Sequence, residues 1–165
     1  MATWRQALTE LAECRAEALK RQAFLLCGNN AEADDLVQDA LVRAFARPLR
    51  VPGPGDAETY VRAIMVHRFV DLARRRALWH RTVRIMDVPE HAADASDAVA
   101  LRTDLARALT GLSARQRACV VLRYYEDLPV AQIAEALRCS EGAVKRYLYE
   151  ATNRLAAWLA TAERD

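Results

Sequence analysis

The stretch from Pro129 to Trp158 constrains this chain most, because its pattern predicts two helices joined by a tight turn. In the first predicted helix the apolar residues share one face, at the spacing of an amphipathic helix: Val130, Ile133, Ala134 and Leu137. The turn follows at residues 138–140, and the hydroxyl of Ser140 is suited to cap the next helix. The segment therefore predicts a pair of helices of which the second points outward.

The second predicted helix has an apolar stripe of its own, formed by Val144, Leu148, Ala151 and Leu155. Its other face carries Lys145, Arg146 and Tyr149 near the N-terminal end. A helix lying in the major groove of DNA places such side chains against bases and phosphates. We therefore predict a helix-turn-helix that contacts DNA through Ser140, Lys145, Arg146 and Tyr149. An ordinary αα-hairpin with a basic surface is the alternative interpretation, and this segment alone leaves it open.

Upstream, the charged side chains of a second stretch are almost all positive. Residues 59–86 contain seven arginines and the single acid Asp71, with Tyr60 and Trp79 interleaved. The arginines are Arg62, Arg68, Arg74, Arg75, Arg76, Arg81 and Arg84. Basic groups neutralise phosphates and aromatic rings stack on bases, a combination typical of proteins that bind single-stranded or partly melted nucleic acid.

A helix is predicted over Tyr60–Arg76, and its 100° projection separates two faces. The buried side is expected to contain Val61, Met65, Phe69 and Leu72. The polar side is expected to contain Tyr60, His67, Asp71 and Arg74, flanked by Arg68 and Arg75. The polar side is the candidate nucleic-acid face of this part of the chain.

The N-terminal part is also predicted to be helical. Residues 4–27 fit one or two amphipathic helices, and Gly28-Asn29-Asn30 ends them. A further helix is predicted over Ala31–Arg47, with one apolar side. Its polar side carries Asp35, Gln38, Asp39 and Arg43. On spacing alone, most such faces are simply solvated.

Two segments interrupt the helical pattern. Residues 48–56 hold three prolines and two glycines and are expected to form an exposed loop. Around residues 87–104 the charge becomes acidic, with small residues that offer little to pack, which is typical of a linker. We predict an all-α fold of two small helical domains, residues 1–84 and 99–165, joined by a flexible acidic linker at residues 85–98. Ser113 and Gln116 fit a capping box within the second domain.

Composition excludes several classes of protein. No apolar run approaches the roughly 20 residues of a membrane span, and no signal-peptide core follows the N-terminus, so a cytoplasmic protein without membrane insertion is expected. Cys14, Cys27, Cys119 and Cys139 form no CxxC pair and are expected to be buried free thiols. The three histidines also lack ligand spacing. We expect no metal, no cofactor and no catalytic set, hence no enzyme.

The segment AEADDLVQDALVRAFAR (residues 31–47) resembles the most recognisable part of bacterial sigma-70-type factors. The run from Leu112 to Leu155 is similar to their C-terminal DNA-binding region. Together with the order of the parts, this covers almost the whole chain. With no additional domain between the two modules, the resemblance is to the small extracytoplasmic-function (ECF) group.

The resemblance implies roles that spacing only permits. Asp35, Gln38, Asp39 and Arg43 would form a face that docks on the large subunit of RNA polymerase core. The −10 promoter element would be read and opened by Tyr60, His67, Arg68, Asp71, Arg74 and Arg75, together with the loop that precedes their helix. The helix after Ser140 would read the −35 element. The implied partners are polymerase core and promoter DNA, and the sequence leaves open whether an anti-sigma factor binds.

Three positions depart from the family pattern. His67 stands where many members have asparagine, Pro129 replaces a common serine or threonine, and Glu150 occupies a position that is frequently basic. The promoter sequence therefore cannot be transferred from relatives. A LuxR-type helix-turn-helix regulator remains the alternative function, because its C-terminal helices look much the same. The N-terminal module discriminates between the two, since a regulator needs a sensing or receiver domain there.

Overall fold

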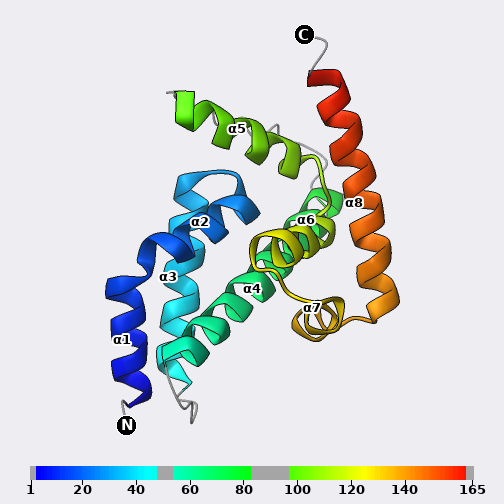
Figure 1. Cartoon of the computed structure of the whole chain (residues 1–165). Coiled ribbons are helices and arrows are strands. Elements are labelled where there is room, and N and C mark those ends of the chain that lie inside the picture. Colours follow the sequence, from blue (N-terminus) through cyan, green and yellow to red (C-terminus); the bar gives the residue numbers. More distant parts are fainter. Residues whose placement is uncertain (1–2, 48–53, 83–96, 163–165) are drawn as a thin grey trace.

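The computed structural model describes residues 3–47, 54–82 and 97–162. Those residues form helices arranged as two modules that pack against each other (Figure 1). The N-terminal module consists of α1 (Trp4–Cys14), α2 (Ala16–Cys27), α3 (Asn30–Ala46) and α4 (Pro54–Thr82). The C-terminal module consists of α5 (Asp97–Thr110), α6 (Ala114–Val120), the π-helical turn η1 (Val121–Tyr125), α7 (Val130–Leu137) and α8 (Glu141–Ala162). The all-α prediction is confirmed.

Local signals fix the ends of the first three helices. The Thr3 hydroxyl accepts a hydrogen bond from the Gln6 amide at 3.3 Å, and the Gln6 side chain accepts one from the Thr3 amide at 2.7 Å, which completes a capping box. Gly28 ends α2 with a φ of 82°, a left-handed conformation that glycine adopts without steric cost. The Asn29 side chain then caps α3. The sequence therefore ends and starts these helices at the positions where the packing of α1, α2 and α3 requires a change of direction.

Helix α4 is the long axis of the N-terminal module and is longer than predicted. It begins at Pro54, so the prediction of a loop reaching residue 56 was wrong for its last three residues. Proline suits the first turn of a helix, where its missing N–H leaves no bond unmade. The earlier part of that predicted loop lies outside the described residues. Val61, Met65 and Phe69 are buried as predicted, whereas Leu72 is only half-buried.

The C-terminal module begins with α5, which includes the last two residues of the predicted linker. The predicted capping box opens α6: the Gln116 amide donates to Ser113 Oγ at 3.2 Å, and the Gln116 side chain accepts from the Ser113 amide at 3.1 Å. At Val121 the helix widens into η1, where the Glu126 amide donates to the Val121 carbonyl at 3.1 Å. Such π-helical turns are uncommon and frequently mark functional positions.

The two modules share one apolar core. It joins Leu19, Leu26 and Met65 of the N-terminal module to Val121 and Ile133 of the C-terminal module. Helix α4 packs against α6 and α7, while α2 packs against α5, α6 and η1. Figure 1 shows α6 crossing α4, with α8 on the side away from α1 and α3. The remaining residues of the predicted linker, 85–96, lie outside the described residues.

The four cysteines, all expected to be buried, differ in their burial. Cys14 is exposed because α1 ends there, so the prediction was wrong for this thiol, and Cys27 and Cys139 are only half-buried. Cys119 is buried as predicted, and burial raises the pKa of its thiol to about 12. Two aromatic side chains, Phe45 near the end of α3 and Tyr125 in η1, are 36% and 41% exposed. Both lie at the ends of elements, beyond the cover of the neighbouring helices.

Candidate nucleic-acid interface

Helix α8 presents the predicted −35 residues to solvent. Ser140 Oγ accepts a hydrogen bond from the Ala143 amide at 3.1 Å, as the sequence predicts for a cap. Val144 and Ala151 are buried, which fixes the rotation of the helix. Lys145 and Arg146 are therefore exposed, and Tyr149 keeps 69% of its surface accessible. The geometry leaves one end of this helix free to enter a groove of DNA.

Glu150 has a structural partner that the sequence reasoning missed. The Gln116 side-chain amide donates to Glu150 Oε2 at 2.8 Å, and this bond ties α8 to the start of α6. Gln116 also completes the capping box, so one buried side chain serves both helices. The signal for this role was weak, because 34 residues separate the two partners. An acid at this position of a basic helix is thus explained by packing within the module.

On α4 the predicted −10 residues do not share one environment. Asp71, Arg74 and Arg75 are exposed, whereas Tyr60, His67 and Arg68 are half-buried. The Tyr60 ring meets the Trp4 ring edge-on, with 5.5 Å between centroids. Trp4 is itself anchored by a 2.9 Å hydrogen bond from its indole N–H to the Ala44 carbonyl. Tyr60 therefore also holds α4 against α1, a role that its place on the polar face did not reveal.

An ion cluster joins the predicted docking face to the predicted −10 face. Arg68 Nε donates to Asp39 Oδ2 at 2.6 Å, and Arg43 Nε donates to the same oxygen at 2.9 Å. Burial alone would raise the pKa of Asp39, but these two hydrogen bonds lower it below its ordinary value. Sequence reasoning placed Asp39 and Arg43 in one site and Arg68 in another. The structure brings all three together, while Asp35 and Gln38 stay exposed on α3.

A cleft of about 650 Å³ lies where the polar face of α4 meets the C-terminal module. Helices α3 and α4 form one wall, and Arg115, Leu137 and Arg138 form the other. His67 lines this cleft, and burial, followed by the nearby positive charge of Arg138, lowers the pKa of its imidazole below 6.5. The cleft is rich in positive charge, with Arg43, Arg47, Arg68, Arg115 and Arg138 among its lining residues.

The C-terminal end of α4 is exposed to solvent. Trp79 is 67% exposed and Leu78 is 54% exposed, next to Arg75 and Arg81. Arg76 differs from its neighbours because its guanidinium pairs with Glu32 of α3 at 2.8 Å. An exposed indole among arginines is suited to stacking on an unpaired base.

Within the described ranges, no helix has the length and apolar composition needed to cross a membrane.

Comparison with known proteins identifies the modules. The family model for sigma-70 region 2 matches residues 11–78, and the model for sigma-70 region 4 matches residues 102–155. Over 162 residues the chain is 32% identical to the RNA polymerase sigma-E factor of Streptomyces coelicolor, covering 94% of this chain and 88% of that protein. The chain belongs to the ECF group of the sigma-70 family.

Other members of the ECF group agree with this assignment. The ECF RNA polymerase sigma factor SigL of Mycobacterium tuberculosis is 35% identical over 147 residues, covering 85% of this chain and 81% of SigL. Among solved structures, the sigma factor RpoE of Bartonella quintana, crystallised with the anti-sigma factor NepR, matches with a TM-score of 0.65 at 25% identity. That match covers 92% of this chain and 96% of RpoE. The similarity to a sigma-factor fold therefore extends over both modules.

Proposed function

We propose that this chain is a sigma factor that binds RNA polymerase core and directs promoter recognition and transcription initiation. The observation that carries this proposal is the presence of both sigma-70 regions in order in one chain, region 2 on the N-terminal module and region 4 on the C-terminal module. Acting on polymerase and chromosomal DNA, the protein would work in the cytoplasm. Catalysis would belong to the polymerase and not to this chain.

Each module would have its own task. The exposed end of α8, with Ser140, Lys145, Arg146 and Tyr149, would read the −35 element in the major groove. The polar face of α4 would hold the −10 element, with Trp79 added to the residues expected from sequence because its ring is exposed among arginines. The docking face for polymerase core would be Asp35, Gln38, Asp39 and Arg43 on α3. We keep residue 84 as the end of the first domain, as the sequence predicts, and propose that the second begins with α5 at Asp97, two residues before the predicted start.

A LuxR-type regulator is disfavoured by the N-terminal module. Such a protein carries a sensing or receiver domain there, whereas residues 11–78 match a sigma-70 region that belongs to polymerase subunits. An anti-sigma factor is a supported further partner, because RpoE, a protein matched over both modules, was crystallised with one. A partner of that kind would bind the two modules together and keep the chain away from polymerase.

Reconstitution with polymerase core tests the proposal, and Asp35→Arg sharpens the test. We expect the parent chain to co-purify with core and to support transcription from a promoter that the holoenzyme selects. Asp35 is exposed and is not a partner in any ion pair within the described ranges, so its reversal should weaken core binding with a stability change below about 0.5 kcal/mol. Asp39→Arg would be less clean, because Asp39 also neutralises Arg43 and Arg68.

The matched control is Glu10→Arg, an equal charge reversal at an exposed acid of α1. It should leave core binding unchanged. Equal binding by the parent and by Asp35→Arg in a pull-down would remove Asp35 from the docking face. Failure of the parent itself to bind core or to support promoter-dependent transcription would overturn the proposed function.

A further inference from the structure

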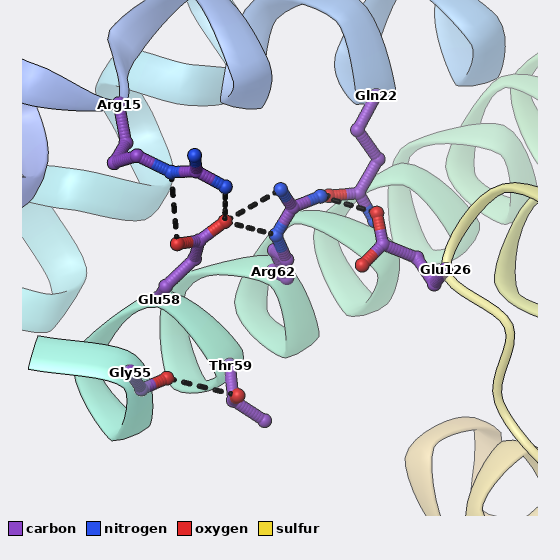
Figure 2. Close-up of polar contacts among 7 residues, drawn as sticks. All are labelled: Arg15, Gln22, Gly55, Glu58, Thr59, Arg62 and Glu126. Carbon is purple, nitrogen blue, oxygen red and sulfur yellow. Dashed lines mark hydrogen bonds and ion pairs between the residues drawn. The ribbon is translucent and has the colours of Figure 1, made fainter.

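Two polar side chains are buried within the described ranges, Gln22 and Gln116, and they differ in how completely they are bonded. Gln22 of α2 accepts a hydrogen bond from Arg62 of α4 at 2.8 Å, and within the same ranges its Nε2 has no partner. The Arg62 guanidinium also donates to Glu58 and to Glu126, the residue that follows η1 (Figure 2). Gln116 of α6, by contrast, uses both ends of its side-chain amide. Its position is therefore fixed more completely than that of Gln22.

The side chain of Gln116 joins the start of α6 to the middle of α8. Its Oε1 accepts from the Ser113 amide at 3.1 Å, and its Nε2 donates to Glu150 Oε2 at 2.8 Å. Only 6% of Gln116 is exposed, so water has little access to these bonds. Glu150 itself is exposed, and its other oxygen, Oε1, has no hydrogen-bond partner in the described part of the chain. The bond to Gln116 is therefore what restrains this carboxylate.

Glu150 lies four residues from an arginine in each direction along α8. Residues four apart on a helix are neighbours, and opposite charges at this spacing attract each other. Among the described residues, however, neither arginine forms an ion pair with Glu150. The Arg146 guanidinium lies over the Tyr147 ring, 5.3 Å from the centroid, and Arg154 donates to the Gly111 carbonyl at 3.4 Å. The carboxylate of Glu150 therefore bonds a neutral amide of another helix, although a guanidinium lies one turn away on each side.

This arrangement leaves the Arg146 guanidinium available for DNA. Arg146 is exposed, and it is one of the side chains expected to contact the −35 element. A guanidinium that is paired with a neighbouring carboxylate has to give up that partner before it can bind a phosphate or a guanine, and this exchange lowers the affinity for DNA. Because Gln116 holds the carboxylate of Glu150, Arg146 avoids the exchange.

We propose that Gln116 is a positioning residue for DNA recognition, whose side-chain amide holds the Glu150 carboxylate toward α6 and so keeps Arg146 unpaired for the −35 element. The inference rests on the proposed function, because it takes α8 as the helix that reads this element. Gln116 is buried, so it acts through Glu150 and Arg146 and not by touching DNA.

The test is Gln116→Glu, which keeps the size of the side chain. It also keeps the capping box, because a glutamate at this position bonds the cap residue as a glutamine does. The change replaces the amide donor with a carboxylate, so that position 116 repels Glu150 instead of holding it. Arg154 already lies at Gly111, just before α6, so a carboxylate repelled by α6 turns toward Arg146 instead. The pairing of Glu150 with Arg146 should then compete with DNA.

Binding is measured by fluorescence anisotropy with a labelled duplex that the parent chain enriches from random-sequence DNA. An added negative charge weakens phosphate contacts in general, so the informative quantity is the coupling between position 116 and Arg146. We expect Gln116→Glu to weaken binding about threefold more in the parent than in the Arg146→Ala chain, within the range found for side chains in contact. Equal weakening in both chains would overturn the positioning role, because a displaced α8 would lose affinity with or without this guanidinium.

Two controls separate added charge from position. Gln6→Glu makes the same amide-to-acid change in the capping box of α1, in the other module, and should leave duplex binding unchanged. The second control repeats the comparison with Arg154→Ala in place of Arg146→Ala, and there Gln116→Glu should weaken binding as much as it does in the parent. A coupling that runs through Arg154 and not through Arg146 would overturn the proposal.

An exchange of the two side chains provides the rescue. Adding Glu150→Gln to Gln116→Glu reverses donor and acceptor, restores the bond and returns the net charge to that of the parent. This double variant should bind the duplex as tightly as the parent, because no carboxylate of α8 is left beside Arg146. Binding as weak as that of Gln116→Glu would overturn the proposal. If circular dichroism finds Gln116→Glu unfolded, Gln116→Met, which removes the donor without adding a charge, decides by the same coupling to Arg146.

Failure of this proposal differs from failure of the proposed function. A parent chain that drives promoter-dependent transcription, together with a Gln116→Glu effect that does not depend on Arg146, removes the positioning role and leaves the sigma function intact. Coupling through Arg146 in a parent that never binds core polymerase would instead support the positioning role and overturn the proposed function. A parent that enriches no duplex sequence would overturn the assignment of α8 as a DNA-binding helix, and the positioning role with it.

Discussion

On α8 the side chains predicted to contact DNA are well clear of the rest of the molecule, whereas on α4 the corresponding face lies partly under the C-terminal module. Tyr149 is 69% exposed, but His67 is half-buried and Arg68 is paired with Asp39. The difference does not come from composition, since both faces combine basic and aromatic residues. Tertiary contacts decide which face is available. In the free chain we therefore expect α8 to contact duplex DNA directly, whereas His67 can be reached only through the cleft.

The largest effect is expected from removing the exposed face. Alanine at Lys145, Arg146 and Tyr149 together should abolish binding to a duplex that the parent holoenzyme selects, and Arg146→Ala alone should cost about 1–3 kcal/mol if it makes a bidentate base contact. Anisotropy titrations at several salt concentrations measure both. Arg154→Ala, which removes one exposed charge further along α8, is the control. If the folded triple variant binds this duplex as tightly as the parent chain, the exposed face of α8 is not the DNA-binding face.

A smaller effect is expected in the titration of His67. Its pKa is lowered by burial and then by Arg138, so the cleft favours the neutral imidazole. The stability that the neutral His67 lends to the contact between the modules is therefore present at pH values above its ordinary pKa of 6.5, and it is lost as the pH falls below that value. The imidazole resonance followed by NMR should have its midpoint below 6.5 in the parent chain.

One variant separates the two causes of that shift. Arg138→Gln removes the nearby charge and should move the His67 midpoint only partway up, because the burial of the imidazole remains. If the His67 midpoint in the parent chain lies at 6.5, the candidate −10 face around His67 is as accessible to solvent as the exposed face of α8.

The smallest effect is expected in stability. Arg138 ends α7 with a φ of 52°, a left-handed conformation that costs a non-glycine residue about 1–2 kcal/mol. Arg138→Gly should raise the free energy of unfolding by about 0.5–1 kcal/mol, after the greater flexibility of glycine in the unfolded chain is counted. Arg138→Ala loses the same guanidinium but keeps the strain, and it should give no such gain in denaturant midpoint. Equal gains from both variants would show that charge repulsion at the cleft, and not backbone strain, is relieved.

Local structure was predictable because its causes lie within a few residues. The hydroxyl of Ser140 and the spacing of Val144 and Ala151 set the start and rotation of α8, and Gly28 marks the end of α2. The exposure of Lys145, Arg146 and Tyr149 follows from that rotation. These features need no knowledge of the rest of the chain.

Long-range partners were not predictable from spacing. Arg62 and Glu126 are 64 residues apart, and Asp39 and Arg68 are 29 apart, so no helical period links them. Pro54 was assigned to a loop because proline disfavours helix interiors, although the first turn accepts it. Whether the predicted docking, −10 and −35 residues act as proposed is likewise beyond the sequence, and the variants above are the means to decide it.

The wide turn at Val121–Tyr125 makes the contact between Glu126 and Arg62 depend on the length of the chain. A π-turn holds one residue more than an α-helical turn, and each residue of an α-helix advances by about 100°. Loss of a single residue here would restore regular α-helix and swing Glu126 by about that angle, away from Arg62, without changing a single charge. One codon inserted or deleted here could therefore make or break the Arg62–Glu126 contact. The spacing between α6 and α7 thus matters to this contact as much as the identity of the two charged residues.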